Sequence, residues 1–198
     1  MESQRSIRKY SDKPVPSHLI SRIIASAIHA PSATNRQPWH FIIIQDSQIK
    51  RRIGDWYLDA WTSIYPNVDP STLPQSSRSG LELGKQMGEV PVLILVCFDI
   101  SRERSSTATF VQGASIYPVV QNILLAARGL GLGTVLTTIH RKYEKEIKQL
   151  LNIPQNIETA ALIPLGYPAE EEHFGGSKRK SLQEVVSYDR WGKNNKTG

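Results

Sequence analysis

The chain has 198 residues with 24 Lys and Arg against 18 Asp and Glu, so its formal net charge is +6. This length predicts a single domain, residues 1–198, that buries its own core, and a composition of 39% hydrophobic and 21% charged residues excludes wholesale disorder. The longest apolar run, Val92–Phe98, is too short to span a membrane, and the N-terminal residues show no apolar export segment. The single cysteine, Cys97, excludes a disulfide framework. We therefore expect a cytoplasmic location without membrane contact.

The first half of the chain predicts two helices, a strand and a long loop. Apolar residues at helical spacing predict a helix over 19–28, which Ser17 caps and Pro31 ends. The β-branched and aromatic run 39–44 predicts a buried strand, and a second helix is predicted over 49–60. Residues 63–79, with three prolines and five serines, predict a loop, and a short helix is expected over 80–87. Loops of this length are typically functional lids or mobile segments, and the residues leave open which applies here.

The second half predicts strands over 91–98, 133–139 and 159–167 and a helix over 143–151. Residues 109–128 predict the longest helix, which is apolar on nearly every side and ends at Gly129 and Gly131. Such a helix is typically buried from several directions or lies in a subunit interface. Residues 168–198 predict an extended C-terminal tail, and its Val185 and Val186 are expected to pack on a partner subunit.

The positive charge and the common catalytic motifs each have a simpler interpretation. The basic residues are scattered and have no aromatic stacking motif beside them, so surface charge with a small anionic ligand is favoured over a nucleic-acid platform. The run Gly129–Gly133 follows a helix and precedes a strand, the reverse of a dinucleotide-binding loop. The five histidines lack metal-binding spacing, and Ser115 is not in a hydrolase elbow, so neither a metal site nor a hydrolase triad is predicted.

Two stretches flank the first predicted helix and suggest a binding site. The stretch from Arg5 to Tyr10 holds three cations and a hydroxyl, and guanidinium groups suit phosphate and carbonyl-type oxygens. The stretch from Ala30 to Trp39 is a turn dense in hydrogen-bonding side chains between two prolines. Either alone is equally well explained as a solvated arm or an ordinary loop, whereas their pairing favours function.

Together these two stretches resemble the FMN-dependent nitroreductase family, whose members begin with an Arg-x-Ser-x-Arg or Lys signature and carry Ala-Pro-Ser-x-x-Asn-x-Gln-Pro-Trp after the first helix. The resemblance continues through 121–127, 131–133, 163–167 and 178–182, and residues 56–87 are the least determined. It implies an α+β class with a three-layer α/β/α nitroreductase-like fold, a central mixed, largely antiparallel sheet, and a homodimer that carries two flavins at its interface. Alternating helices and strands by themselves would have favoured a parallel sheet.

The resemblance also implies site residues. Arg8 would lie near the N1 and C2-oxygen edge of FMN, Arg5 and Ser6 near the ribityl phosphate, and Arg179 would grip that phosphate with help from Lys178 or Lys180. Family members often have arginine where this chain has Gln4, so one phosphate contact is open. Four residues of the turn would reach a flavin bound mainly by the other subunit: Pro31, Ser32, Ala33 and Asn35. A third segment, Leu136, Thr137 and Thr138, would lie along the flavin ring near N5.

The implied function is an NAD(P)H-dependent FMN oxidoreductase that reduces a nitroaromatic or a quinone by a ping-pong mechanism. Flavin N5 carries the chemistry, so no catalytic side chain is required. The loop 63–79 is expected to shape the acceptor pocket. Alternatives are a flavin-fragmenting dimethylbenzimidazole synthase-like enzyme or a reductive dehalogenase-like enzyme of the same fold, and a non-catalytic basic nucleic-acid-binding module. The residues predict neither the physiological acceptor nor a preference between NADH and NADPH.

Overall fold

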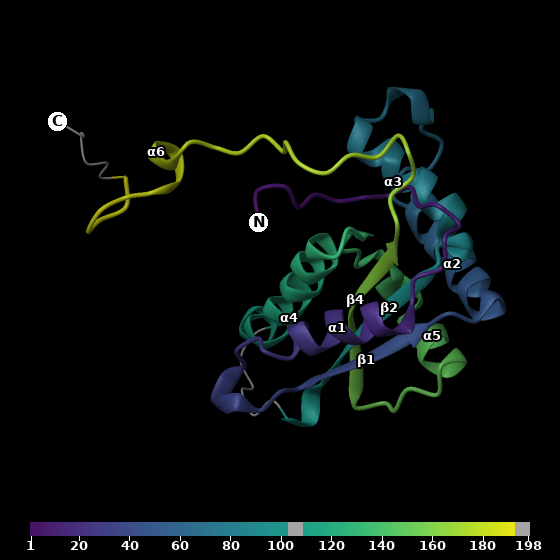
Figure 1. Ribbon diagram of the computed structural model, residues 1–198, viewed down its shortest axis with the longest axis horizontal. Coiled ribbons are helices and arrows are strands. Elements are labelled where there is room, and N and C mark those ends of the chain that lie inside the picture. Colours follow the sequence, from purple (N-terminus) through teal and green to yellow (C-terminus); the bar gives the residue numbers. More distant parts are fainter. Residues whose placement is uncertain (103–108, 193–198) are drawn as a thin grey trace.

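The computed structural model describes residues 1–102 and 109–192. Helices and strands alternate irregularly along this part of the chain (Figure 1). The helices are α1 (Ser17–Ala27), α2 (Ser47–Thr62), α3 (Gln75–Gln86), α4 (Thr109–Gly129), α5 (Glu144–Leu150) and α6 (Leu182–Val185). The strands are β1 (Trp39–Ile44), β2 (Val92–Asp99), β3 (Gly133–Thr134) and β4 (Ile157–Gly166), and short 3₁₀ turns include η1 (Ala33–Asn35) and η5 (Ile139–Tyr143).

The four strands form one sheet in the order β1-β2-β4-β3. All three strand pairs are antiparallel. A parallel element enters through a single bridge between Ser6 and Thr134, which attaches the N-terminal segment beside β3. The predicted α+β class with a largely antiparallel sheet is therefore confirmed.

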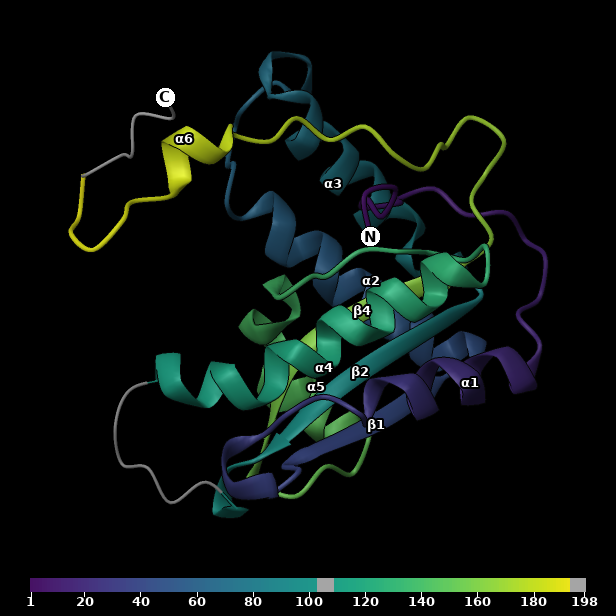
Figure 2. The ribbon, with the colours of Figure 1, turned by 60° about the vertical axis from the view of Figure 1, so that its left-hand side comes forward.

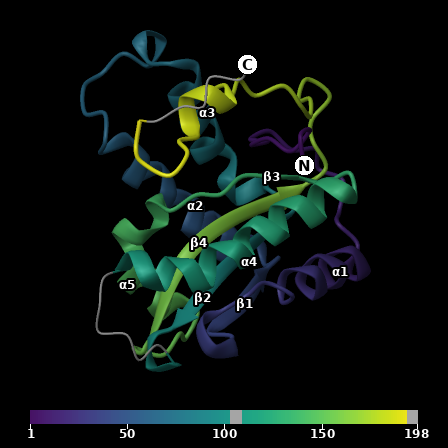
Figure 3. The same cartoon turned by 90° about the vertical axis from the view of Figure 1, so that its left-hand side faces the viewer.

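The sheet separates two apolar cores, because alternate residues of a strand point to opposite faces. In β2, Ile94 and Val96 pack with α1 and α4, whereas Leu93 and Leu95 pack with α2, α3 and α5. Figure 2 shows α1 and α4 along one face of the sheet, and Figure 3 shows α2 and α3 beyond the other face. The run from Val92 to Phe98 is apolar at every position, as a central strand with both faces covered requires. This confirms the predicted three layers.

Three predicted boundaries are wrong. Ser17 is the first residue of α1 and caps nothing with its side chain, since Pro16 holds the N-cap position. The loop predicted over 63–79 ends at Pro74, and α3 begins at Gln75, because the serines after Pro74 belong to a helix with an apolar face. The strand predicted over 133–139 stops at Thr134, and only Thr137 makes a further bridge, to Leu162.

The tail after β4 leaves the layered body (Figure 1). Its apolar side chains Val185, Tyr188 and Trp191 are all exposed, and Trp191 is exposed completely. Part of α4 is also uncovered: Tyr117 is 42% exposed, and Ala114 and Gln121 lie on the same exposed side. In the described ranges, no helix has the length and apolar character needed to cross a membrane.

Candidate functional site

The N-terminal segment is held against β3 by Ile7. Its backbone amide donates a hydrogen bond to the carbonyl oxygen of Thr134 at 3.0 Å, and its side chain is completely buried. Since side chains alternate along an extended segment, Ser6 and Arg8 point away from that core. Gly133 makes this close approach possible, because a Cβ there would lie 2.7 Å from the Ile7 Cγ2 atom.

Gly133→Ala is therefore expected to destabilise the protein by about 1–3 kcal/mol, the usual cost of overpacking a filled core. Gly129→Ala is the matched control, because a Cβ there meets nothing within 4 Å. Urea unfolding of both variants tests this expectation. Equal stability of Gly133→Ala and the wild type would contradict it.

A cavity of about 280 Å³ opens beside Arg8. One wall is the segment between β3 and η5, and the others are α2 and α3. Four of the predicted site residues meet there, namely Arg8, Leu136, Thr137 and Thr138. The other lining residues are Tyr57, Trp61, Ser76, Ser77, Gly80, Val135 and Ile139.

Thr137 fixes the wall that follows β3. It exchanges backbone hydrogen bonds with Leu162 at 3.1 and 2.9 Å, and its hydroxyl donates to the Leu162 carbonyl oxygen at 2.7 Å. With Thr137 held inward, Leu136 and Thr138 on either side are left exposed. The result is an apolar side chain and a hydroxyl presented on a short rigid segment.

The electrostatics of the cavity combine one permanent cation with neutral hydroxyls. Burial raises the pKa of Tyr57 to about 12, against the opposing effects of the Thr137 hydroxyl and the Arg8 charge. The Tyr57 phenol therefore stays protonated at neutral pH. A positive planar group beside neutral donors suits a ligand edge that is rich in oxygen and nitrogen acceptors.

The predicted turn residues lie at η1, beyond the far end of α1 from the N-terminal segment, and do not line this cavity. Thr34 and Asn35 have left-handed backbones, with φ of 49° and 54°. The turn is held by the Ser115 hydroxyl, which accepts from the Ala33 amide at 3.1 Å, and by the Ser32 hydroxyl, which accepts from the Gln37 amide at 3.0 Å. Left-handed backbone in non-glycine residues is costly and gathers at functional sites.

The remaining predicted residues are also apart from the cavity lining. Arg5 is exposed, and Ser6 is half-buried beside Thr134. Arg179 is exposed on the tail, where its guanidinium donates to the carbonyl oxygen of Lys178 at 3.0 Å. One copy of the chain thus assembles part of the predicted set, and Pro31, Ser32, Ala33 and Asn35 stand on a separate surface.

Sequence reasoning missed the helical side of the cavity. Tyr57 and Trp61 are spaced four residues apart on α2, a pattern that indicates burial and carries no sign of a ligand. Ser76 and Ser77, which belong to the range 63–79, line the cavity from the first turn of α3.

A larger cavity of about 440 Å³ lies beside β1 and contains none of the predicted site residues. Its lining includes Trp39, His40, Cys97, Asp99 and Arg102. Burial raises the pKa of the Cys97 thiol to about 12, so it is not a reactive thiolate at neutral pH. The turn motif meets this cavity only through its last two residues, Pro38 and Trp39, and none of the residues expected to contact the flavin lines it.

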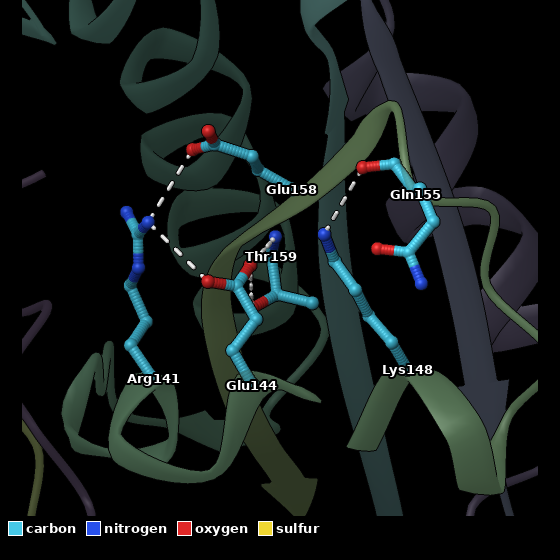
Figure 4. Close-up of polar contacts among 6 residues, drawn as sticks. All are labelled: Arg141, Glu144, Lys148, Gln155, Glu158 and Thr159. Carbon is cyan, nitrogen blue, oxygen red and sulfur yellow. Dashed lines mark hydrogen bonds and ion pairs between the residues drawn. The ribbon is translucent and has the colours of Figure 1, made fainter. Parts of the chain in front are cut away.

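Polar contacts join η5 and α5 to β4 (Figure 4). Glu144 accepts from the backbone amide and the hydroxyl of Thr159 at 2.6 and 2.8 Å, and Arg141 lies between Glu144 and Glu158 at 3.4 and 3.3 Å. Burial by itself would raise the pKa of Glu144, but the Thr159 hydrogen bonds and the Arg141 charge lower it overall. These contacts fix η5 and the start of α5 on β4, and η5 directly follows the segment that forms one wall of the cavity.

His140 is buried in η5, and neither of its ring nitrogens has a hydrogen-bond partner among the residues that the structure describes. Burial lowers its pKa from 6.5 to about 4. A group whose pKa falls on folding contributes stability above its unfolded pKa and loses it as the pH decreases toward its folded pKa.

We therefore expect the free energy of unfolding to decrease by up to about 3 kcal/mol between pH 6.5 and 4 because of this residue. His140→Leu should be less sensitive to acid by that amount. Urea unfolding at pH values of about 7.5, 5.5 and 4.5, on either side of the unfolded pKa, compares the two proteins. The same acid sensitivity in both would assign the loss to other groups.

The family model described as the Nitroreductase family matches residues 1–167. A relative from Methanothermobacter thermautotrophicus, described as an NADH dehydrogenase or NAD(P)H nitroreductase, is 37% identical over 86% of this chain and 76% of its own length. The iodotyrosine dehalogenase 1 homolog of Caenorhabditis elegans is 29% identical over 94% of this chain and 59% of its own. The solved structure of an iodotyrosine deiodinase bound to FMN and 3-iodo-L-tyrosine is 23% identical, covers 96% of both chains and has a TM-score of 0.74, a likeness of fold.

Proposed function

Because the chain belongs to the nitroreductase family, we propose that it is an FMN-dependent oxidoreductase that uses NAD(P)H to reduce an electron-poor acceptor such as a nitroaromatic or a quinone. The observation that carries this proposal is the cavity in which Arg8 meets the segment 136–138, which the resemblance to the family places along the flavin ring. Relatives described as NAD(P)H nitroreductases support the reductant, and the FMN in the deiodinase structure supports the cofactor.

The residues of the cavity fit a flavin. The ring system combines apolar faces with a polar edge of acceptors. Exposed Leu136 offers apolar contact on a rigid segment, and the Arg8 guanidinium offers donors to the N1 and C2-oxygen edge. Arg5, Ser6 and Arg179 would hold the phosphate. Bound FMN would supply the reversible two-electron chemistry.

The protein's own contribution is then binding and electrostatics. The permanent charge of Arg8 favours negative charge on the ligand edge beside it. The protonated Tyr57 can donate a hydrogen bond and carries no charge of its own. If nicotinamide and acceptor occupy the same open space in turn, the kinetics are ping-pong.

We also propose that the active form is a homodimer. In the described part of the chain, the strip of α4 and the apolar residues of the tail are exposed, and the turn 31–35 lies apart from the cavity. A second copy that covers α4 and receives the tail would also place Pro31, Ser32, Ala33 and Asn35 toward the neighbouring cavity. The cytoplasmic location expected from the single cysteine stays a prediction.

The test is to purify the protein, load it with FMN and follow NADH and NADPH oxidation with a nitroaromatic or a quinone as acceptor. Parallel double-reciprocal plots are expected. Failure to bind FMN, or failure to reduce any such acceptor, would refute the proposal.

Relatives named iodotyrosine dehalogenase or deiodinase favour reductive dehalogenation as a second candidate. Halide release from a halogenated phenol by the reduced protein, without nitro or quinone reduction, would select that activity. Formation of dimethylbenzimidazole from reduced FMN in air would instead indicate a flavin-fragmenting enzyme.

A further inference from the structure

The N-terminal segment and the chain beyond β4 run antiparallel beside each other. The Ser11 amide donates to the Tyr167 carbonyl oxygen at 2.9 Å, and the Ala169 amide donates to the Lys9 carbonyl oxygen at 3.1 Å. At the far end of this ribbon, the Gly175 amide donates to the Ser3 carbonyl oxygen at 2.8 Å. The end of this ribbon thus lies near two parts of the chain that carry predicted phosphate contacts, Arg5 in the N-terminal segment and Arg179 in the tail.

Arg128, in the last turn of α4, holds the far end of the ribbon. Its Nε donates to the Ser3 hydroxyl at 3.1 Å, and its guanidinium lies 4.0 Å from the centre of the Phe174 ring. Ser3 forms the Ser3–Gly175 hydrogen bond, and Phe174 directly precedes Gly175. One half-buried side chain therefore contacts both strands of the ribbon at the point where they separate.

The tail leaves the ribbon through two consecutive glycines, whose backbone is less restricted than that of other residues, so a contact beside them is needed to fix its direction. Gly175 and Gly176 have φ of 100° and 62°, and a Cβ at either position would meet no atom within 4 Å, so packing does not restrict them. Arg5 lies two residues beyond Ser3, and Arg179 lies four residues beyond Gly175. Since Ile7 fixes the segment that follows Arg5, we expect a change at the anchor to move mainly the chain that leads to Arg179, and so to alter the spacing of the two cations.

We propose that Arg128 is a positioning residue, which holds Arg5 and Arg179 at the spacing needed to grip one phosphate monoester without touching that phosphate itself. The inference rests on the proposed FMN function. A phosphate monoester is a dianion that two guanidinium groups can hold together. The strength of this attraction depends on the distance and orientation of the two guanidinium groups.

The test compares the dissociation constants of FMN and riboflavin, which differ only in the phosphate. Wild type is expected to prefer FMN. Arg128→Ala should reduce that preference by about tenfold, the scale of one lost charge-assisted contact, with riboflavin binding unchanged. Arg128→Lys, which keeps the charge but not the fork, should fall between them. Phe174→Leu should reduce the preference less than Arg128→Ala.

Arg51→Ala is the matched control, because it removes the same charge from an exposed ion pair with Glu89 on the other side of the sheet. It should leave the FMN preference intact. If Arg128→Ala weakens both flavins equally, or neither, this inference is overturned while the proposed function stands. If wild type binds neither flavin, the proposed function itself is overturned, and the positioning role with it.

Discussion

Replacing Arg8 by alanine is expected to weaken FMN binding by about 10- to 150-fold. Arg8 is the permanent cation of the cavity formed with Leu136, Thr137 and Thr138, and a hydrogen bond to a charged group contributes about 1.5–3 kcal/mol. The reduction potential of the bound flavin should also decrease, because the charge that favours the reduced, anionic ring is gone. Fluorescence titration and spectroelectrochemistry measure the two effects.

Arg8→Lys separates charge from geometry. Lysine keeps a positive charge but loses the planar donors, so binding should recover in part and the potential should recover more fully. Thermal unfolding of both variants serves as the structural check, since Arg8 is half-buried and its loss should leave the core intact. Wild-type FMN affinity in Arg8→Ala would show that the flavin lies elsewhere.

If the proposed homodimer forms, ending the chain after Gly176 is expected to convert it to monomers at micromolar concentration and to abolish FMN binding. The deletion removes the apolar side chains Val185, Tyr188 and Trp191, which are exposed in the described part of the chain, together with Arg179. It should also withdraw the partner's copy of the turn 31–35 from the site. Sedimentation velocity and flavin titration provide the two readouts.

Arg179→Ala is the control for the deletion. It removes a phosphate contact but leaves the tail, so flavin binding should weaken while the dimer persists. A truncated protein that remains dimeric would show that α4 alone makes the interface. The interface would then not depend on the tail.

The sequence was informative where the signal is local. Alternation and helical spacing located β1, β2, β4, α1, α2 and α4 to within a few residues, because burial of one face imposes a period on the chain itself. The two stretches on either side of the first helix, 5–10 and 30–39, led to the family by resemblance, and the family model then confirmed it. Local spacing was less informative where turn and helix compete. The serines after Pro74 predicted a loop, yet α3 starts there because its apolar face packs on α2.

Only the tertiary structure showed the helical side of the cavity and the anchor of the termini. Tyr57 and Thr137 are 80 positions apart in the chain and meet because the sheet brings the segment after β3 beneath α2. Arg128 meets Ser3 and Phe174 for a similar reason, since antiparallel pairing returns the end of the chain to its beginning. A side chain that packs in a core and one that lines a cavity obey the same spacing rule. Whether the side chain meets another segment or open space depends on how distant parts of the chain pack together, and the spacing along the sequence does not reveal this.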